Sequence, residues 1–165
     1  MSVGTGGFHD DTGYTRGTWW RVRGLVLASP PRPIHRHGAE LGDFGVGPYL
    51  DFGAFPVGSQ REYAVGAGLN GALWLGDSFA FIPAVGWYRQ ALGAGASEHG
   101  LNLGFALGGM HYDEWGIAAL QWGIRVEARY GLGSRHERSW LVGGELDSLV
   151  LGIIPLAAYI YWAGD

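Results

Sequence analysis

Residues 62–75 read EYAVGAGLNGALWL, and larger apolar side chains occupy nearly every second position of this stretch. One face carries Tyr63, Val65, Ala67, Leu69, Leu73 and Leu75, whereas the other carries Glu62, Ala64, Gly66, Gly68, Asn70 and Ala72. A repeat of two residues is the period of a β-strand, because successive side chains point to opposite faces. The stretch therefore predicts a strand with one strongly apolar face and one face of small or polar residues.

The same alternation returns along most of the chain, and helical periodicity is nearly absent. In residues 100–108, for example, Leu101, Leu103 and Phe105 alternate with glycine, asparagine and alanine. Turn-forming stretches separate such segments. The pattern predicts eight strands, at residues 17–28, 39–54, 62–75, 79–89, 99–110, 116–131, 138–147 and 149–162. We therefore expect a single all-β domain over residues 1–165, with a flexible N-terminal segment at 1–15.

The composition excludes several other classes of protein. The 165 residues include 31 glycines and are 47% apolar and 14% aromatic, which fits neither a disordered chain nor a collagen-like repeat. With a net charge of -4, the chain lacks the basic surface that nucleic-acid binding requires. We expect neither a nucleic-acid partner nor a cofactor.

The composition of the two strand faces decides which of them points inward. A soluble barrel buries its large apolar residues and covers the other face with lysine, glutamate, threonine and serine. Here that other face is mainly glycine, alanine and asparagine, which suits the crowded interior of a small barrel. The apolar face is therefore expected to contact lipid, in a single antiparallel up-and-down transmembrane β-barrel of eight strands. A soluble carrier with inverted faces is a minor alternative.

Aromatic residues support this orientation. If successive strands alternate in direction, seven of the eight predicted strands place an outward-facing aromatic residue at the same end of the barrel. These residues are Trp20, Phe52, Tyr63, Trp87, Tyr130, Trp140 and Trp162. Amphipathic rings favour the headgroup level of a bilayer, so this set predicts a lipid-facing aromatic girdle.

This pattern of strands and girdle resembles the small eight-stranded outer-membrane barrels of Gram-negative bacteria, the OmpA and OmpX type, over about residues 18–162. The resemblance implies a bacterial outer-membrane location, with membrane lipid as the surrounding partner. The Asp77-Ser78 turn and residues 103–115, LGFALGGMHYDEW, are also similar to stretches of the lipid A palmitoyltransferases, which are barrels of this kind. That similarity implies acyl transfer as an alternative function.

The inward positions divide the expected lumen into two halves. Near the girdle they carry seven charged residues: Arg21, Arg23, Asp51, Glu62, Arg125, Glu127 and Arg129. Unpaired charges are costly in a narrow lumen, so we expect ion pairs that plug the barrel. The other half is apolar and includes Leu25, Leu27, Trp74, Ile82, Ile117, Leu151 and Ile153. These residues form either a packed core, which we favour, or a pocket for a hydrocarbon chain.

The connections at the apolar end contain the candidate chemistry. Ser78, His111 and Asp113 would supply a hydroxyl, a general base and a carboxylate for acyl transfer, although serine and aspartate are also ordinary turn residues. Residues of metal-binding type occur together in one loop, where we expect solvated side chains and no metal. These loop residues are His35, His37 and Glu40.

Two functional classes follow from the sequence. The first is a non-enzymatic membrane scaffold, or a binder of a small amphiphile at the mouth of the barrel. The second is an enzyme that modifies the acyl chains of lipid A or phospholipid. Ordinary turn chemistry explains the candidate catalytic residues, and we favour the first class.

Overall fold

The computed structural model describes residues 2–10, 13–23, 26–27, 41–57, 60–91, 97–112, 118–133, 136 and 138–147. All regular structure in this part of the chain is β-strand. The strands are β1 (Ser2–Asp10), β2 (Gly13–Arg23), β3 (Val26–Leu27), β4 (Phe44–Val57), β5 (Gln60–Trp74), β6 (Phe79–Ala91), β7 (Ser97–Tyr112), β8 (Ala118–Gly131) and β9 (Arg138–Asp147). Within these residues, no helix is long and apolar enough to cross a membrane.

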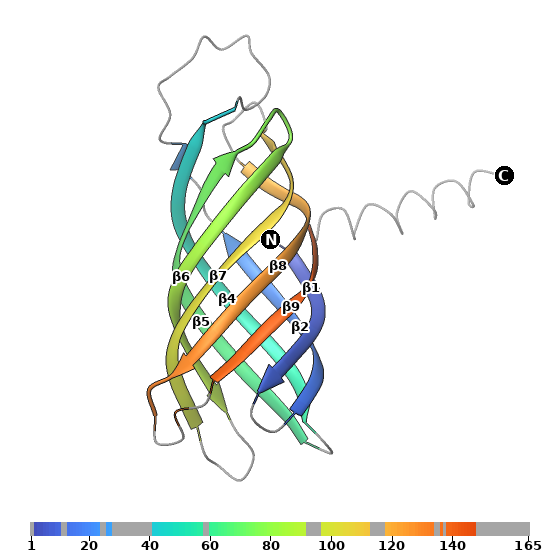
Figure 1. Ribbon diagram of the computed structural model, residues 1–165, viewed down its shortest axis with the longest axis vertical. Helices are drawn as coiled ribbons and strands as arrows, with labels where there is room; N and C mark the ends of the chain where they lie inside the picture. The colour runs from blue at the N-terminus through green and yellow to red at the C-terminus, as the bar shows by residue number, and fades with distance from the viewer. Residues whose placement is uncertain are drawn as a thin grey trace, which may run out of the picture.

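The strands close into one antiparallel barrel (Figure 1). Successive strands pair from β4 to β9, and β1 completes the wall because it pairs with both β2 and β9. β2 and β3 pair with β4 in one continuous register, with Arg23 opposite Tyr49 and Val26 opposite Val46. They therefore share one position in the wall. The described residues thus form the closed eight-stranded antiparallel barrel that the sequence predicts.

Most strand boundaries agree with the sequence pattern. β9 has the predicted bounds, and β5 to β8 begin and end within two residues of theirs. The strand predicted at 39–54 begins later, at Phe44, because Gly42 has a φ of 87°, which lies outside the extended region. The strand predicted at 149–162 lies outside the described residues.

The structure differs from the prediction at the N-terminus. The sequence predicts a flexible segment at residues 1–15, but Ser2–Asp10 forms β1. This strand occupies the wall position between β2 and β9, where the sequence pattern predicts residues 149–162. Several glycines in β1 conceal it from a search for alternating large residues. They are required by close packing, since a Cβ on Gly6 would overlap the backbone of β9.

The two faces of the wall have opposite character, in the direction that the sequence predicts. Large apolar side chains on the outer face are strongly exposed, for example Leu69 at 63% and Ile124 at 58%. The inner face carries small residues and buried polar ones, such as Asn70 and Asn102. The two-residue period therefore directs apolar side chains outward and polar side chains into the lumen.

The wall is not equally long all around the barrel. In the described part of the chain, β1 and β9 have 9 and 10 residues, whereas β4 to β8 have between 13 and 16. In Figure 1, β4 to β8 extend further than β1 and β9 towards the upper end of the barrel. Among the described residues, the side chains that line the upper end therefore come mainly from the longer strands.

Gly6→Ala is expected to weaken the closure between β1 and β9. The added Cβ would overlap the backbone of Val142 and Gly143, and overpacking of this kind costs about 1 to 3 kcal/mol. Gly144→Ala is the matched control, because a Cβ there would meet only Gly123 O, at 3.9 Å. Urea unfolding followed by tryptophan fluorescence measures both variants. If both variants have the same free energy of unfolding, the close packing of β1 against β9 at Gly6 is contradicted.

Candidate functional site

Five charged side chains meet in the lumen and form ion pairs that we call the central network. Asp51 on β4 accepts hydrogen bonds from Arg21 Nε at 2.6 Å and from Arg125 Nη2 at 2.7 Å. Glu127 on β8 accepts from Arg21 Nη2 at 3.1 Å, from Arg129 Nε at 3.0 Å and from Arg125. Only 2% to 7% of each side chain is exposed, so the network is shielded from solvent.

Strand register brings these residues together. Arg21 and Asp51 are direct cross-strand partners on β2 and β4. Arg125, Glu127 and Arg129 occupy every second position of β8, on its buried inner face. β8 lies four wall positions from β4, which is the opposite side of an eight-stranded ring. The ion pair of Arg125 with Asp51 therefore crosses the lumen between opposite walls, and that of Arg21 with Glu127 also joins strands that are not neighbours.

Small inward residues make room for the long arginine side chains. Gly104 is the cross-strand partner of Glu127, and a Cβ there would lie 2.6 Å from Val126 O and 3.0 Å from Glu127 Cα. Gly66 is the partner of Asp51, and its Cβ would lie 3.5 Å from Asp51 Cβ. Larger side chains at these positions would compete with the network for the same space.

A second ion pair, between Arg23 and Glu145, lies nearer the end of the barrel where β9 ends. Arg23 Nη2 donates to Glu145 Oε1 at 2.5 Å. Ser2 Oγ links the two groups, because it accepts from Arg23 Nη1 at 3.1 Å and donates to Glu145 Oε2 at 3.3 Å. Sequence reasoning missed Glu145 as a lumen residue. The signal was available, since Glu145 shares the inward face of β9 with buried Leu141.

Six of the seven charged residues predicted for the lumen take part in these two groups of ion pairs. The seventh, Glu62, lies in β5, and its side chain is outside the described structure.

Another buried carboxylate, Glu98 on β7, was not predicted from the sequence. Its Oε1 accepts from Gly133 N at 2.6 Å and from His99 N at 3.2 Å, so it ties the connection after β8 to the start of β7.

Aromatic rings pack against the guanidinium groups. Arg21 Cζ lies 4.0 Å from the centroid of the Tyr49 ring, and Arg129 Cζ lies 5.2 Å from that of Tyr88. The Tyr49 hydroxyl donates to Asn102 Oδ1 at 3.0 Å. Cation–π contacts of this kind are stronger away from water, and they restrict where the arginine side chains can lie.

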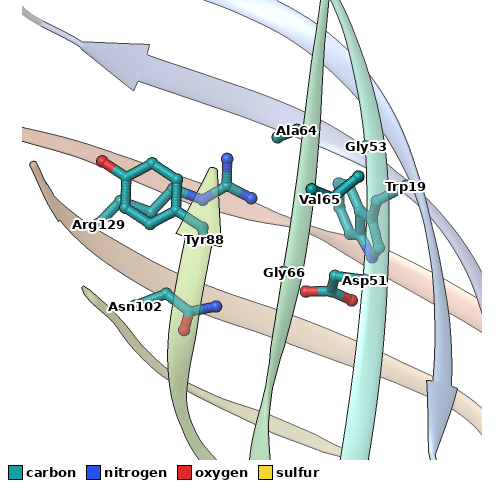
Figure 2. Close-up of a pocket in the computed structure, with 9 residues that line it drawn as sticks. All are labelled: Trp19, Asp51, Gly53, Ala64, Val65, Gly66, Tyr88, Asn102 and Arg129. Atoms are coloured by element: carbon teal, nitrogen blue, oxygen red, sulfur yellow. The ribbon is translucent and has the colours of Figure 1, made fainter. Parts of the chain in front are cut away.

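A small cavity borders the central network (Figure 2). It is lined by Trp19, Asp51, Gly53, Ala64, Val65, Gly66, Tyr88, Asn102 and Arg129. Its volume is about 10 Å³, which is roughly the space that one water molecule needs. A hydrocarbon chain does not fit in this cavity.

An apolar cluster lies in the lumen beside β5, β6 and β7, at the end of the barrel opposite Trp87 and Trp140. Its buried members are Ala72, Trp74, Ala80, Ile82, Ala106 and Met110. Two of the residues predicted for the apolar half, Trp74 and Ile82, therefore lie together. Leu27 lies in β3, but its side chain is outside the described structure, as are the remaining four predicted residues. These four are Leu25, Ile117, Leu151 and Ile153.

The candidate catalytic residues are only partly described. Ser78 is exposed in the turn between β5 and β6, and its carbonyl accepts a hydrogen bond from Met110 N at 2.9 Å. This bond brings the turn next to His111, which follows Met110 in β7, but the His111 side chain and Asp113 lie outside the described structure.

Within the described ranges, no group of three His, Cys, Asp or Glu side chains could hold a metal ion. The loop residues considered for that role, also outside these ranges, are His35, His37 and Glu40.

Together, the fold and the lumen define a small closed β-barrel with an apolar exterior and a charged interior. No protein-family model matches the chain, and no curated protein matches its sequence. The barrel is similar in structure to Ail, the attachment invasion locus protein of Yersinia pestis, with a TM-score of 0.45 and 11% sequence identity. The match covers 88% of this chain and 94% of that one.

Glu127→Ala is expected to destabilise the barrel by about 3 to 5 kcal/mol, because it leaves three buried guanidinium groups with fewer partners. Asp77→Ala is the control, since it removes an exposed carboxylate from a turn and should change stability by about 0.5 kcal/mol or less. Urea unfolding followed by tryptophan fluorescence gives both values. If the loss at Glu127 is no larger than that at Asp77, the central network does not hold the walls together.

Proposed function

We propose that this protein is a membrane-spanning β-barrel of a bacterial outer membrane, that it is not an enzyme, and that its charged residues close the lumen. The observation that carries the proposal is the distribution of side chains, with charged groups buried inside and large apolar groups exposed outside. Water disfavours this arrangement, because a continuous exposed apolar surface is costly there. In a bilayer, the same arrangement is the stable one.

The construction of the wall supports a transmembrane position. A tilted strand needs about 9 to 11 residues to cross the hydrocarbon core. The described strands reach this length, from 9 residues in β1 to 16 in β7, with β2 and β3 counted as one wall position. A closed barrel also pairs the backbone groups of every strand within the wall, which lipid requires. An even number of antiparallel strands is typical of bacterial outer-membrane barrels and supports that location.

Outward aromatic residues support a lipid-facing girdle. The ring centroids of Trp20 and Phe52 are 5.5 Å apart, and those of Phe52 and Tyr63 are 6.0 Å apart. These side chains come from β2, β4 and β5, and exposed aromatic residues continue on β6, β8 and β9. The latter are Trp87, Tyr130 and Trp140, whereas Trp162 lies outside the described residues. Rings at this level would lie among lipid headgroups.

The central network supports the proposal of a plugged lumen. Its side chains extend across the interior from opposite walls, and the cavity beside them has a volume of about 10 Å³. A barrel plugged in this way would act as a scaffold in the membrane and not as a pore. A small amphiphile would bind at the mouth, beside the apolar cluster, and not among the arginines.

Leu103→Arg tests the membrane location. Leu103 is 50% exposed on the outer face of β7, so the change should have an effect within about 0.5 kcal/mol in a soluble protein. Near the middle of a bilayer, it should instead cost about 2 to 4 kcal/mol, measured as the free energy of unfolding in phosphatidylcholine vesicles. Gly104→Arg provides a contrast, because its inward side chain would overfill the lumen and should prevent folding. Wild-type protein that stays monodisperse without detergent or lipid would contradict the proposal.

Planar bilayer recordings test the plug. Wild-type protein should give no sustained single-channel current, because charged side chains span the lumen. Steady, large currents would contradict a closed lumen.

A lipid-modification assay tests the absence of enzyme activity. Mass spectrometry of phospholipid and lipid A that have been incubated with the protein should detect no change in either lipid. Acyl gain or loss that disappears in the Ser78→Ala and His111→Ala variants would instead establish the acyl-modifying enzyme.

A further inference from the structure

The outer wall carries a band of cationic and aromatic side chains on four adjacent strands, β6 to β9. We call this band the interfacial strip, and its members are Trp87, Arg89, His99, Tyr130, Arg138 and Trp140. All six side chains are exposed. They lie towards the end of the barrel where residues 92–96 connect β6 to β7 and residues 132–137 connect β8 to β9.

Strand register places these residues side by side. Arg89 is the cross-strand partner of His99, and Tyr130 is that of Arg138. The rings of Trp87 and His99 contact each other, with centroids 5.5 Å apart. Since outward positions repeat every two residues, Arg89 and Arg138 lie one outward position nearer the barrel end than Trp87 and Trp140. Strand register aligns Trp87, Leu101 and Tyr130 in one row, which we call the aromatic row, and Arg138 continues this row on β9. Arg89 lies beside the row, one outward position nearer the barrel end.

The charge of the strip is positive. On the described part of these four strands near this end, the exposed ionised side chains are Arg89 and Arg138. The carboxylates of Glu98 and Glu127 belong to the same strands but are buried in the lumen. Beyond the aromatic row, the outer face continues as apolar surface through residues such as Leu103.

We propose that the interfacial strip binds the headgroup phosphate of an anionic membrane lipid. Arginine presents a planar fork of donors that matches phosphate oxygens. Tryptophan and tyrosine favour the headgroup level, and clustered basic residues at that level attract anionic lipids. The apolar surface below the aromatic row would contact the acyl chains, so the strip fits a lipid better than a soluble phosphate. This proposal rests on the membrane location proposed above.

Native mass spectrometry of lipid retention tests the strip. Protein in detergent micelles receives equal amounts of phosphatidylglycerol and phosphatidylcholine, and the bound lipids are counted. Arg89→Gln and Arg138→Gln should each lower the preference for phosphatidylglycerol about fivefold, and the double variant about twentyfold. Arg16→Gln is the matched control, because Arg16 is exposed on β2, two wall positions from β9 and outside the strip. It should change the preference by less than about twofold.

The outcomes separate this proposal from the proposal of a membrane barrel. An equal loss in Arg16→Gln would show that diffuse charge attracts the lipid, and a wild-type protein without preference for phosphatidylglycerol would also overturn the strip as a site. In both cases the protein still requires detergent. A protein that is monodisperse in plain buffer and retains neither lipid would contradict the membrane location itself. Migration on unheated denaturing gels confirms that each variant is folded.

Discussion

The burial of arginine side chains in a narrow lumen constrains the rest of the structure. Guanidinium groups stay charged, so Arg21, Arg125 and Arg129 need acidic partners inside the barrel. Arg21 meets Asp51 as a cross-strand neighbour, and Arg129 meets Glu127 on the same strand. Arg125 reaches Asp51 because β4 and β8 lie opposite each other in a closed wall. A register shift of one residue in either strand would turn its charged side chains outward. The ion pairs and the strand register therefore depend on each other.

The glycine content follows from the same crowding. The chain has 31 glycines, and many of them lie in strands, not in turns. Beside the Tyr49 ring, which packs on Arg21, a Cβ on Gly68 would lie 2.8 Å from Tyr49 Cε1, and one on Gly86 would overlap the Tyr49 hydroxyl. Glycine occurs here because a neighbouring side chain occupies the space, which is one of its recognised uses within strands. The large side chains of the lumen are thus accommodated by the small ones around them.

The barrel separates two environments across a single layer of backbone. Inside, charged side chains form ion pairs, and the apolar cluster around Trp74 and Ile82 lies nearer one end. Outside, the surface is apolar until it reaches aromatic and cationic residues near the other end, such as Trp87 and Arg89. This order of apolar, aromatic and cationic side chains matches the order of hydrocarbon, interface and phosphate in a bilayer. In the proposed membrane location, lipid is the solvent to which the outer face is adapted.

The sequence by itself determined which side chains point inward and which point outward, because side-chain direction in a strand is a local property with a period of two. Leu69 and Asn70 could be assigned to opposite faces on this ground, and six members of the charged lumen were found in the same way. Only the tertiary structure decided that Arg23 pairs with Glu145, 122 residues away, and that glycine-rich β1 completes the wall. Both outcomes depend on contacts between segments distant in the chain, and the geometry of the closed wall selects them. A local pattern of side chains does not contain that geometry.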